Sequence, residues 1–215
     1  MIRPAEPQDQ PRHPALAAAS PASAAIRPAR PTDLAALGEF FAGLSLRTRY
    51  LRFFAAVTPT GSMLRRLAGG AGVDVLVATD GGVIIGHAMA VDRGGPGRDT
   101  TADVGVVVAD AWQGRGIGSA LLRALIARAQ ARGVAWLTFD VQPGNTLMRG
   151  IIARRWPAAR PGYSSDYLTF RVPLLPLPRR RLPSRHGGVA AVPRRRAGRG
   201  HPSGSSRTLI RGLIR

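Results

Sequence analysis

Apolar residues in the first third of the chain recur every three or four positions, which is the spacing of a buried helix face. Thr32 is predicted to cap the first of these helices, with Asp33 in its first turn. Ser45 begins a second segment with the same period, and a third short helix is predicted over residues 62–68. The first apolar face consists of Leu34, Leu37, Phe40 and Phe41.

From Val73 onward the helical period gives way to runs of β-branched residues, which indicate strands. Residues 73–79 and 83–91 are two such runs, and Asp80-Gly81-Gly82 between them predicts a tight hairpin turn. Residues 94–99 are interpreted as a loop, and residues 101–109 as a third strand.

The strongest helical period covers Ile117–Arg132, and Gly133 is predicted to end that helix. A strand at 136–141, a helix at 145–155 and a last strand at 163–172 follow. Helices, three antiparallel strands, helix, strand, helix and strand in this order predict an α+β domain over residues 26–173. The apolar face of the long helix consists of Leu121, Leu122, Leu125, Ile126 and Ala129.

The two flanks lack any such period. Residues 1–25 are rich in Ala, Pro and Ser, and residues 174–215 mix five prolines with Arg clusters and Gly. Segments of this kind bury too little apolar surface to offset the entropy of ordering, so we expect a disordered leader and a disordered tail. Prolines interrupt the mildly apolar stretch at 15–25, which disfavours an export signal.

Cysteine and charge narrow the function classes. The chain has no cysteine, which excludes disulfides, thiolate metal sites and a cysteine nucleophile and fits a cytoplasmic location. No apolar run approaches the roughly 18 residues of a membrane helix, so no membrane association is expected. Of the 31 basic residues, all arginines, 12 lie in residues 171–215, which contain no acid. Because the excess charge sits in an aromatic-free tail, nucleic acid is not an expected partner of the domain, although the tail could bind an anionic polymer.

The most informative motif is a glycine-rich turn between a strand and the long helix, Gln113-Gly114-Arg115-Gly116-Ile117-Gly118. Glycines allow close approach of an anion, and unpaired N–H groups at the helix start can bind a pyrophosphate. A dinucleotide-binding turn needs a glycine where Ser119 stands and a parallel unit before it, and the lysine of a phosphate-binding Walker loop is absent. A glycine turn that binds nothing remains an alternative.

The same hexapeptide resembles the acyl-CoA pyrophosphate motif of the GNAT acyltransferases, Arg/Gln-x-x-Gly-x-Gly/Ala, and the resemblance extends over about 145 residues. Residues 26–33 resemble the family's usual first strand and the start of its first helix. Leu44–Phe54 is similar to a segment of bacterial GNAT domains related to protein-lysine acetyltransferases. Asn145 matches the family asparagine that contacts the pantetheine arm.

This resemblance implies a GNAT fold, a mixed, mostly antiparallel twisted sheet flanked by helices, whose fourth and fifth strands splay apart. It also implies acetyl-CoA as co-substrate, with pantetheine in that gap, and no metal. The cofactor-binding residues it implies are Val106, Val107, Val108, Gln113, Gly114, Arg115, Gly116, Ile117, Gly118, Ser119 and Asn145.

The sequence offers fewer candidates for catalytic side chains than for cofactor-binding residues. Asp103 occupies the place of the family's strand-four glutamate and is the candidate general base, although it could simply end the strand in solvent. Ile152 stands where the family often has a tyrosine that protonates the leaving sulfur, and Arg155-Trp156-Pro157 replaces the usual Gly-Phe. His87 is interpreted as a hydrogen-bonded core histidine. No metal-ligand spacing or Ser-His-acid arrangement stands out.

The arginines Arg47, Arg49 and Arg52 are interpreted as a solvated helix face, with binding of an acidic substrate group as the alternative. The expected function is N-acetylation of an amine by direct transfer in a ternary complex. The acceptor is a protein lysine or a small-molecule amine, and a homodimer is left open. A catalytically inactive acyl-CoA-binding module, or anionic-polymer binding through the tail, is the alternative.

Overall fold

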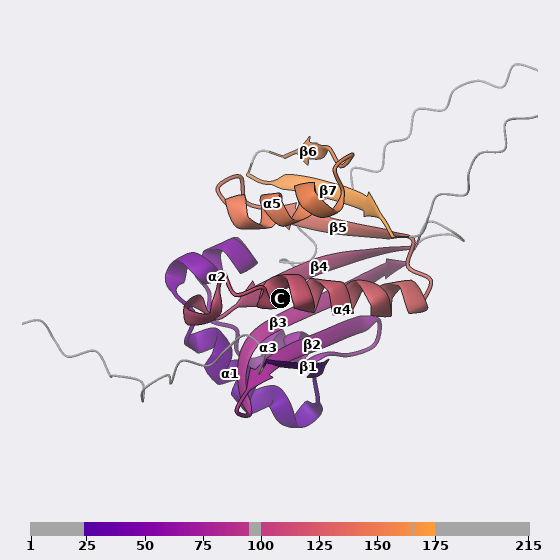
Figure 1. Ribbon diagram of the computed structural model, residues 1–215. Coiled ribbons are helices and arrows are strands. Elements are labelled where there is room, and N and C mark those ends of the chain that lie inside the picture. The colour runs from indigo at the N-terminus through magenta and orange to yellow at the C-terminus, as the bar shows by residue number, and fades with distance from the viewer. Residues whose placement is uncertain (1–23, 95–99, 165, 175–215) are drawn as a thin grey trace, which may run out of the picture.

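The computed structural model describes residues 24–94, 100–164 and 166–174, in which helices lie on both faces of a central sheet (Figure 1). The helices are α1 (Leu34–Ala42), α2 (Leu46–Phe53), α3 (Gly61–Ala68), α4 (Ile117–Ala131) and α5 (Thr146–Arg155), with 3-10 turns η2 (Pro31–Asp33) and η4 (Asp110–Trp112). The strands are β1 (Ala25–Pro28), β2 (Val73–Asp80), β3 (Val83–Gly94), β4 (Thr101–Val108), β5 (Trp136–Val141), β6 (Pro161–Tyr163) and β7 (Leu168–Pro173).

The seven strands form one sheet in the order β1-β2-β3-β4-β5-β7-β6. Every neighbouring pair is antiparallel except β4 and β5, which run parallel and are connected through α4. The prediction of an α+β domain with a mixed, mostly antiparallel sheet is therefore confirmed.

Alternating side chains of the central strands pack into two separate hydrophobic cores, one on each face of the sheet. Leu76 and Ala78 of β2 pack with the apolar face of α4, whereas Val75 and Val77 pack with the helices on the opposite face. Strands buried on both faces read as nearly continuous apolar runs, which explains the pattern of residues 73–91. Figure 1 shows α4 across one face of the sheet and α1 and α3 on the other.

Most predicted elements are confirmed, and two details are wrong. The predicted last strand is a hairpin of β6 and β7 instead of one strand, with Gly162 paired to Thr169. Thr32 does not cap α1, because it lies within the turn η2, and the carboxylate of Asp33 accepts a hydrogen bond from the Arg30 backbone N–H at 2.7 Å.

The flanks fall largely outside the described residues. The predicted loop at 94–99 coincides with the end of β3 at Gly94 and then with residues 95–99, which are not described. Most of the predicted disordered leader (1–25) and tail (174–215) is also outside the description, which begins at residue 24 and ends at 174. At their inner ends the predictions are wrong, because Ala25 belongs to β1 and Leu174 is buried in the core. Within the described ranges, none of the helices has the length and apolar character required to cross a membrane.

Candidate functional site

The site forms where two neighbouring strands separate. β4 and β5 pair only over Thr101–Asp103 and Trp136–Thr138, although both strands continue further. From Val104 to Val108, β4 keeps its partner β3 on one edge, and no strand of the described residues pairs with the other edge. The backbone of that edge is therefore open to a ligand, as the resemblance implied.

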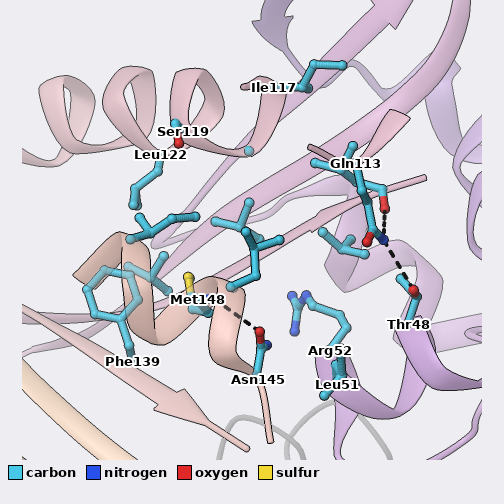
Figure 2. A pocket seen from close by; sticks show the side chains of 18 of the residues that line it. Thr48, Leu51, Arg52, Gln113, Ile117, Ser119, Leu122, Phe139, Asn145 and Met148 are labelled. Atoms are coloured by element: carbon cyan, nitrogen blue, oxygen red, sulfur yellow. Dashed lines mark hydrogen bonds between the residues drawn. The ribbon is translucent and has the colours of Figure 1, made fainter. Parts of the chain in front are cut away.

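A cavity of about 340 Å³ occupies this gap (Figure 2). Residues from β4, β5, α2, the start of α4 and the start of α5 line it. The predicted site residues among them are Asp103, Val106, Val107, Val108, Gln113, Gly114, Gly116, Ile117, Gly118, Ser119 and Asn145. Arg115 is the exception: its guanidinium lies over the Trp112 ring at 5.0 Å, and it does not line the cavity.

The glycine-rich turn brings the start of α4 to one end of the cavity. Gly114 and Gly116 have φ angles of 75° and 82°, a left-handed conformation that any residue with a Cβ adopts only under strain. No side chain caps α4, and its first intrahelical bond runs from the Ala120 N–H to the Gly116 carbonyl. The N–H groups at the start of the helix are therefore left for an anion.

Hydrogen bonds tie α2 to the segment before that turn. The carboxylate of Asp110 accepts from the Ser45 N–H at 2.9 Å, the Ser45 hydroxyl at 2.7 Å and the Thr48 hydroxyl at 2.7 Å. Burial alone raises the pKa of Asp110, but these bonds outweigh it and the pKa is lowered. Gln113 Nε2 donates to the Val108 carbonyl at 3.0 Å, so this side chain closes the end of β4.

Asn145 both caps α5 and lines the cavity. Its Oδ1 accepts a hydrogen bond from the Met148 N–H at 3.1 Å, which caps α5. The side-chain amide remains a donor beside the open edge of β4, which is the position that the resemblance requires for a contact to pantetheine.

Asp103 lies at the point where β4 and β5 separate, and it is buried, not solvated. Burial raises the pKa of its carboxyl group, and the charge and hydrogen bond of Arg93 oppose that shift without cancelling it. A carboxyl with a raised pKa next to a cavity suits proton abstraction from an ammonium group near neutral pH.

Arg52 contradicts the prediction of a solvated arginine face. Its guanidinium points into the cavity from α2 (Figure 2), whereas Arg47 is exposed and Arg49 donates to the Thr58 hydroxyl. Burial lowers the pKa of Arg52 to about 10. The side chain turns inward because α2 packs on β4, a tertiary contact that helical spacing alone does not predict.

His87 is a core residue, as predicted. It is fully buried on β3, its Nε2 lies 2.8 Å from the Leu67 carbonyl, and its ring contacts Phe41 edge-on. Burial, assisted by the positive charge of Arg52, lowers its pKa to about 3, so the ring is neutral at physiological pH.

The residue at the family's tyrosine position, Ile152, belongs to the hydrophobic core and does not line the cavity. Ile152 is fully buried on the core-facing side of α5, and Met148 and Ile151 face the cavity instead. No tyrosine lines the cavity among the described residues, and these residues hold no cluster of three or more His, Cys, Asp or Glu placed for a metal ion.

Residues 44–154, about half of the chain, match the model of the acetyltransferase (GNAT) family. The chain belongs to the GNAT family. It is 36% identical over 133 residues to acetyltransferase Pat of Mycolicibacterium smegmatis, covering 60% of this chain and 39% of that protein. It is 36% identical over 85 residues to L-methionine sulfoximine/L-methionine sulfone acetyltransferase of Pseudomonas aeruginosa, covering 39% of this chain and 49% of that protein. The GNAT-family chain thus spans less than half the length of these curated relatives.

Solved structures agree with this assignment of family and fold. The GNAT domain of S. lividans PAT superposes with a TM-score of 0.62 at 27% identity, covering 70% of this chain and 90% of that domain. An acetyltransferase of Salmonella typhimurium solved with acetyl-CoA has a TM-score of 0.55 at 24% identity, covering 79% and 99%, and shows the shared fold.

Sequence reasoning missed the cavity residues Thr48 and Leu51 of α2 and Arg154 of α5. It named Arg52 only under the alternative that the arginines of this segment bind an acidic substrate group. Helical spacing marked the apolar face of α2 but gave no signal of which residues face β4. Gly105 was the available clue, because an isolated glycine within a valine-rich strand indicates close approach of another group.

Proposed function

We propose that this domain is an acetyl-CoA-dependent N-acetyltransferase that transfers the acetyl group directly to an amine bound beside it. The observation that carries the proposal is the open edge of β4, which begins beyond Asp103 and leads to an uncapped helix start at Gly116. An extended ligand with a pyrophosphate at one end fits this combination of open strand edge and anion site.

Different groups of the chain would bind different parts of acetyl-CoA. Backbone groups of Val106–Val108 would hold the pantetheine amides, and the Asn145 amide would donate from the facing side. The turn from Gly114 to Ser119 would bind the pyrophosphate, and Gln113 would keep the end of β4 in place through its bond to Val108.

The transfer forms an N–C bond to the acetyl carbon and breaks the C–S bond of the thioester. Asp103 would take the proton that the ammonium group of the acceptor must lose before attack. Because no tyrosine lines the described cavity, the departing thiolate would take its proton from solvent or from the protonated Asp103.

Two kinds of acceptor are consistent with the relatives. One relative is named as acetyltransferase Pat, and the other is named as an acetyltransferase of L-methionine sulfoximine and L-methionine sulfone. The acceptor is therefore proposed as an amine, either a protein lysine or a small molecule. Because Thr48, Leu51 and Arg52 of α2 line the cavity, these residues of the segment Leu44–Phe54 are proposed to shape the acceptor side.

A second candidate is an acyl-CoA-binding module without turnover. The burial of Ile152 favours it, because that position cannot supply an acid for the sulfur. This candidate shares the cofactor site and differs only in the absence of an acceptor reaction.

The test is acceptor-dependent release of free CoA by the full-length chain with acetyl-CoA and a panel of amines. Gly116→Glu places a negative charge at the proposed pyrophosphate site and should abolish release. Gly133→Glu is the matched control, because Gly133 has a similar φ of 76° and open space at the far end of α4. Unchanged turnover by Gly116→Glu contradicts the proposed site, and acetyl-CoA binding without turnover on any amine supports the second candidate.

A further inference from the structure

The guanidinium of Arg52 is partly buried at the wall of the cavity and has no anionic partner among the described residues. Its Nε and Nη2 atoms are inaccessible to solvent and have no hydrogen-bond partner in the described part of the chain. The residue forms no ion pair among the described residues, and its cation contact is the Phe53 ring at 5.0 Å. An arginine desolvated in this way lacks the acceptor atoms that normally offset its burial.

Neither acid of the cavity forms an ion pair with Arg52 among the described residues. Asp103 is paired with Arg93, and Asp140 accepts a hydrogen bond from the Thr169 hydroxyl at 2.7 Å. Within the described part of the chain, the guanidinium therefore faces the cavity as a positive charge without an ion-pair partner, together with the hydroxyl of Thr48 and the amide of Asn145. Nη1 is the guanidinium nitrogen that is not among the inaccessible atoms, so a ligand that supplies a carboxylate would accept a charge-assisted hydrogen bond from it.

Gly105 creates the space that Arg52 occupies. A Cβ at this position would lie 2.4 Å from Cζ of Arg52, so the guanidinium rests where any other residue of β4 would place its side chain. The rest of that stretch of β4 is valine, and a glycine within a strand weakens it. The glycine is therefore explained by the position of the guanidinium.

Asp103 and Gly105 share one face of β4, because side chains two residues apart in a strand point the same way. Their Cα atoms are about 7 Å apart along the strand. Arg52, lying over Gly105, and the proposed base Asp103 thus face the same part of the cavity. A molecule with an ammonium group and a carboxylate a few bonds apart fits between them, whereas a lysine side chain carries its ammonium far from any carboxylate of its own.

We propose that Arg52 determines acceptor specificity by binding a carboxylate, and that the acceptor is a small amine of the α-amino-acid type. This inference rests on the proposed function and narrows its acceptor class. Arg52 orients the acceptor so that its amino group meets Asp103, and it takes no part in proton transfer.

The test compares matched acceptors with the full-length chain. L-leucine and 3-methylbutylamine, and L-methionine and 3-(methylthio)propylamine, differ within each pair only by the carboxylate. We expect kcat/KM to favour the amino acid at least about tenfold, as one charge-assisted hydrogen bond provides. Arg52→Met should reduce that ratio to near one, Arg52→Lys should keep part of it, and the exposed control Arg47→Met should retain all of it.

A second variant keeps the arginine and moves it. Gly105→Ala leaves the charge in the chain but displaces the flexible guanidinium from β4, and it should also lose the preference for amino acids. Calorimetric binding of acetyl-CoA to Arg52→Met should match the unmodified chain, which separates acceptor recognition from the cofactor site.

The proposal is overturned if Arg52→Met lowers kcat equally for both members of a pair, which assigns the guanidinium to the thioester or to structure. It is also overturned if the unmodified chain prefers a lysine within a peptide to free amino acids. If the chain acetylates nothing, the proposed function fails, and calorimetric titrations with L-leucine and with 3-methylbutylamine then test the carboxylate site alone. Binding of L-leucine but not of the amine, lost in Arg52→Met, supports that site. Equal binding of both compounds, or no binding of either, overturns it.

Discussion

Replacing Arg52 by methionine should make the protein more stable, because Nε and Nη2 of its guanidinium are buried and have no hydrogen-bond partner among the described residues. Methionine keeps the length and the apolar stem of arginine and removes the charge. Burial lowers the pKa of Arg52 from 12.5 to about 10. A shift of that size corresponds to a cost of about 3 kcal/mol for holding the charged form in the folded state.

The measurable gain is smaller than this cost. The Phe53 ring at 5.0 Å offsets part of it through a cation–π contact, so we expect unfolding free energy to rise by about 1 to 3 kcal/mol. Since the folded-state pKa is depressed, the cost is fully present at all pH values well below 10. The gain should therefore be the same at pH 6 and pH 8.

Urea unfolding followed by circular dichroism measures this difference directly. Arg47→Met on the same helix is the control, and its exposed side chain should change stability by less than about 0.5 kcal/mol. A loss of stability of about 1 kcal/mol or more in Arg52→Met would refute the reasoning, because it would mean that the guanidinium has stabilising partners when the chain is folded.

Three further predictions concern other residues. Asp33→Asn should lower the free energy of unfolding at pH 7 by about 1 kcal/mol after allowance for solvent screening. The hydrogen bond from Arg27 lowers the pKa of Asp33 to about 2, so the difference between the two proteins should vanish as pH falls towards 2. Urea unfolding at pH 7 and pH 2 measures this difference. Asn145→Asp should retain the cap of α5 yet weaken acetyl-CoA binding, whereas Asn145→Ala should also lose about 1 kcal/mol of stability, and calorimetry with urea unfolding separates the two effects. The kcat/KM of the unmodified chain should fall as pH decreases through the raised pKa of Asp103. Asp103→Asn should lower kcat by roughly 100-fold or more and should remove this acidic limb of the pH profile. A pH profile that is the same in both proteins would exclude Asp103 as the base.

The order of elements could be read from the sequence because each signal is local. The β-branched run of β2, the turn at Asp80–Gly82 and the period of α4 each reflect burial within a few residues. The hairpin of β6 and β7 was missed although the polar residues Ser164-Ser165-Asp166 interrupt the predicted strand at 163–172. The pairing of Gly162 with Thr169 depends on register, which the residues of a single strand do not display.

The site was predictable where backbone geometry dominates and unpredictable where tertiary packing decides. Gly114 and Gly116 marked the anion turn because only glycine adopts their φ angles without strain. The gap between β4 and β5 was expected from the family resemblance, not from the residues themselves. The inward turn of Arg52 depends on how α2 packs over Gly105, and no periodicity reports such a contact.

The most direct test of the central claim is calorimetric titration of acetyl-CoA into the full-length chain, with Gly116→Glu and Gly116→Gln as a matched pair. Both substitutions impose the same backbone strain at φ 82°, and they differ only in charge. We predict micromolar binding by the unmodified chain, weakened in Gly116→Gln and weakened at least about tenfold further in Gly116→Glu. Equal affinity of a folded Gly116→Glu and the unmodified chain, or no binding by the unmodified chain, would contradict the account.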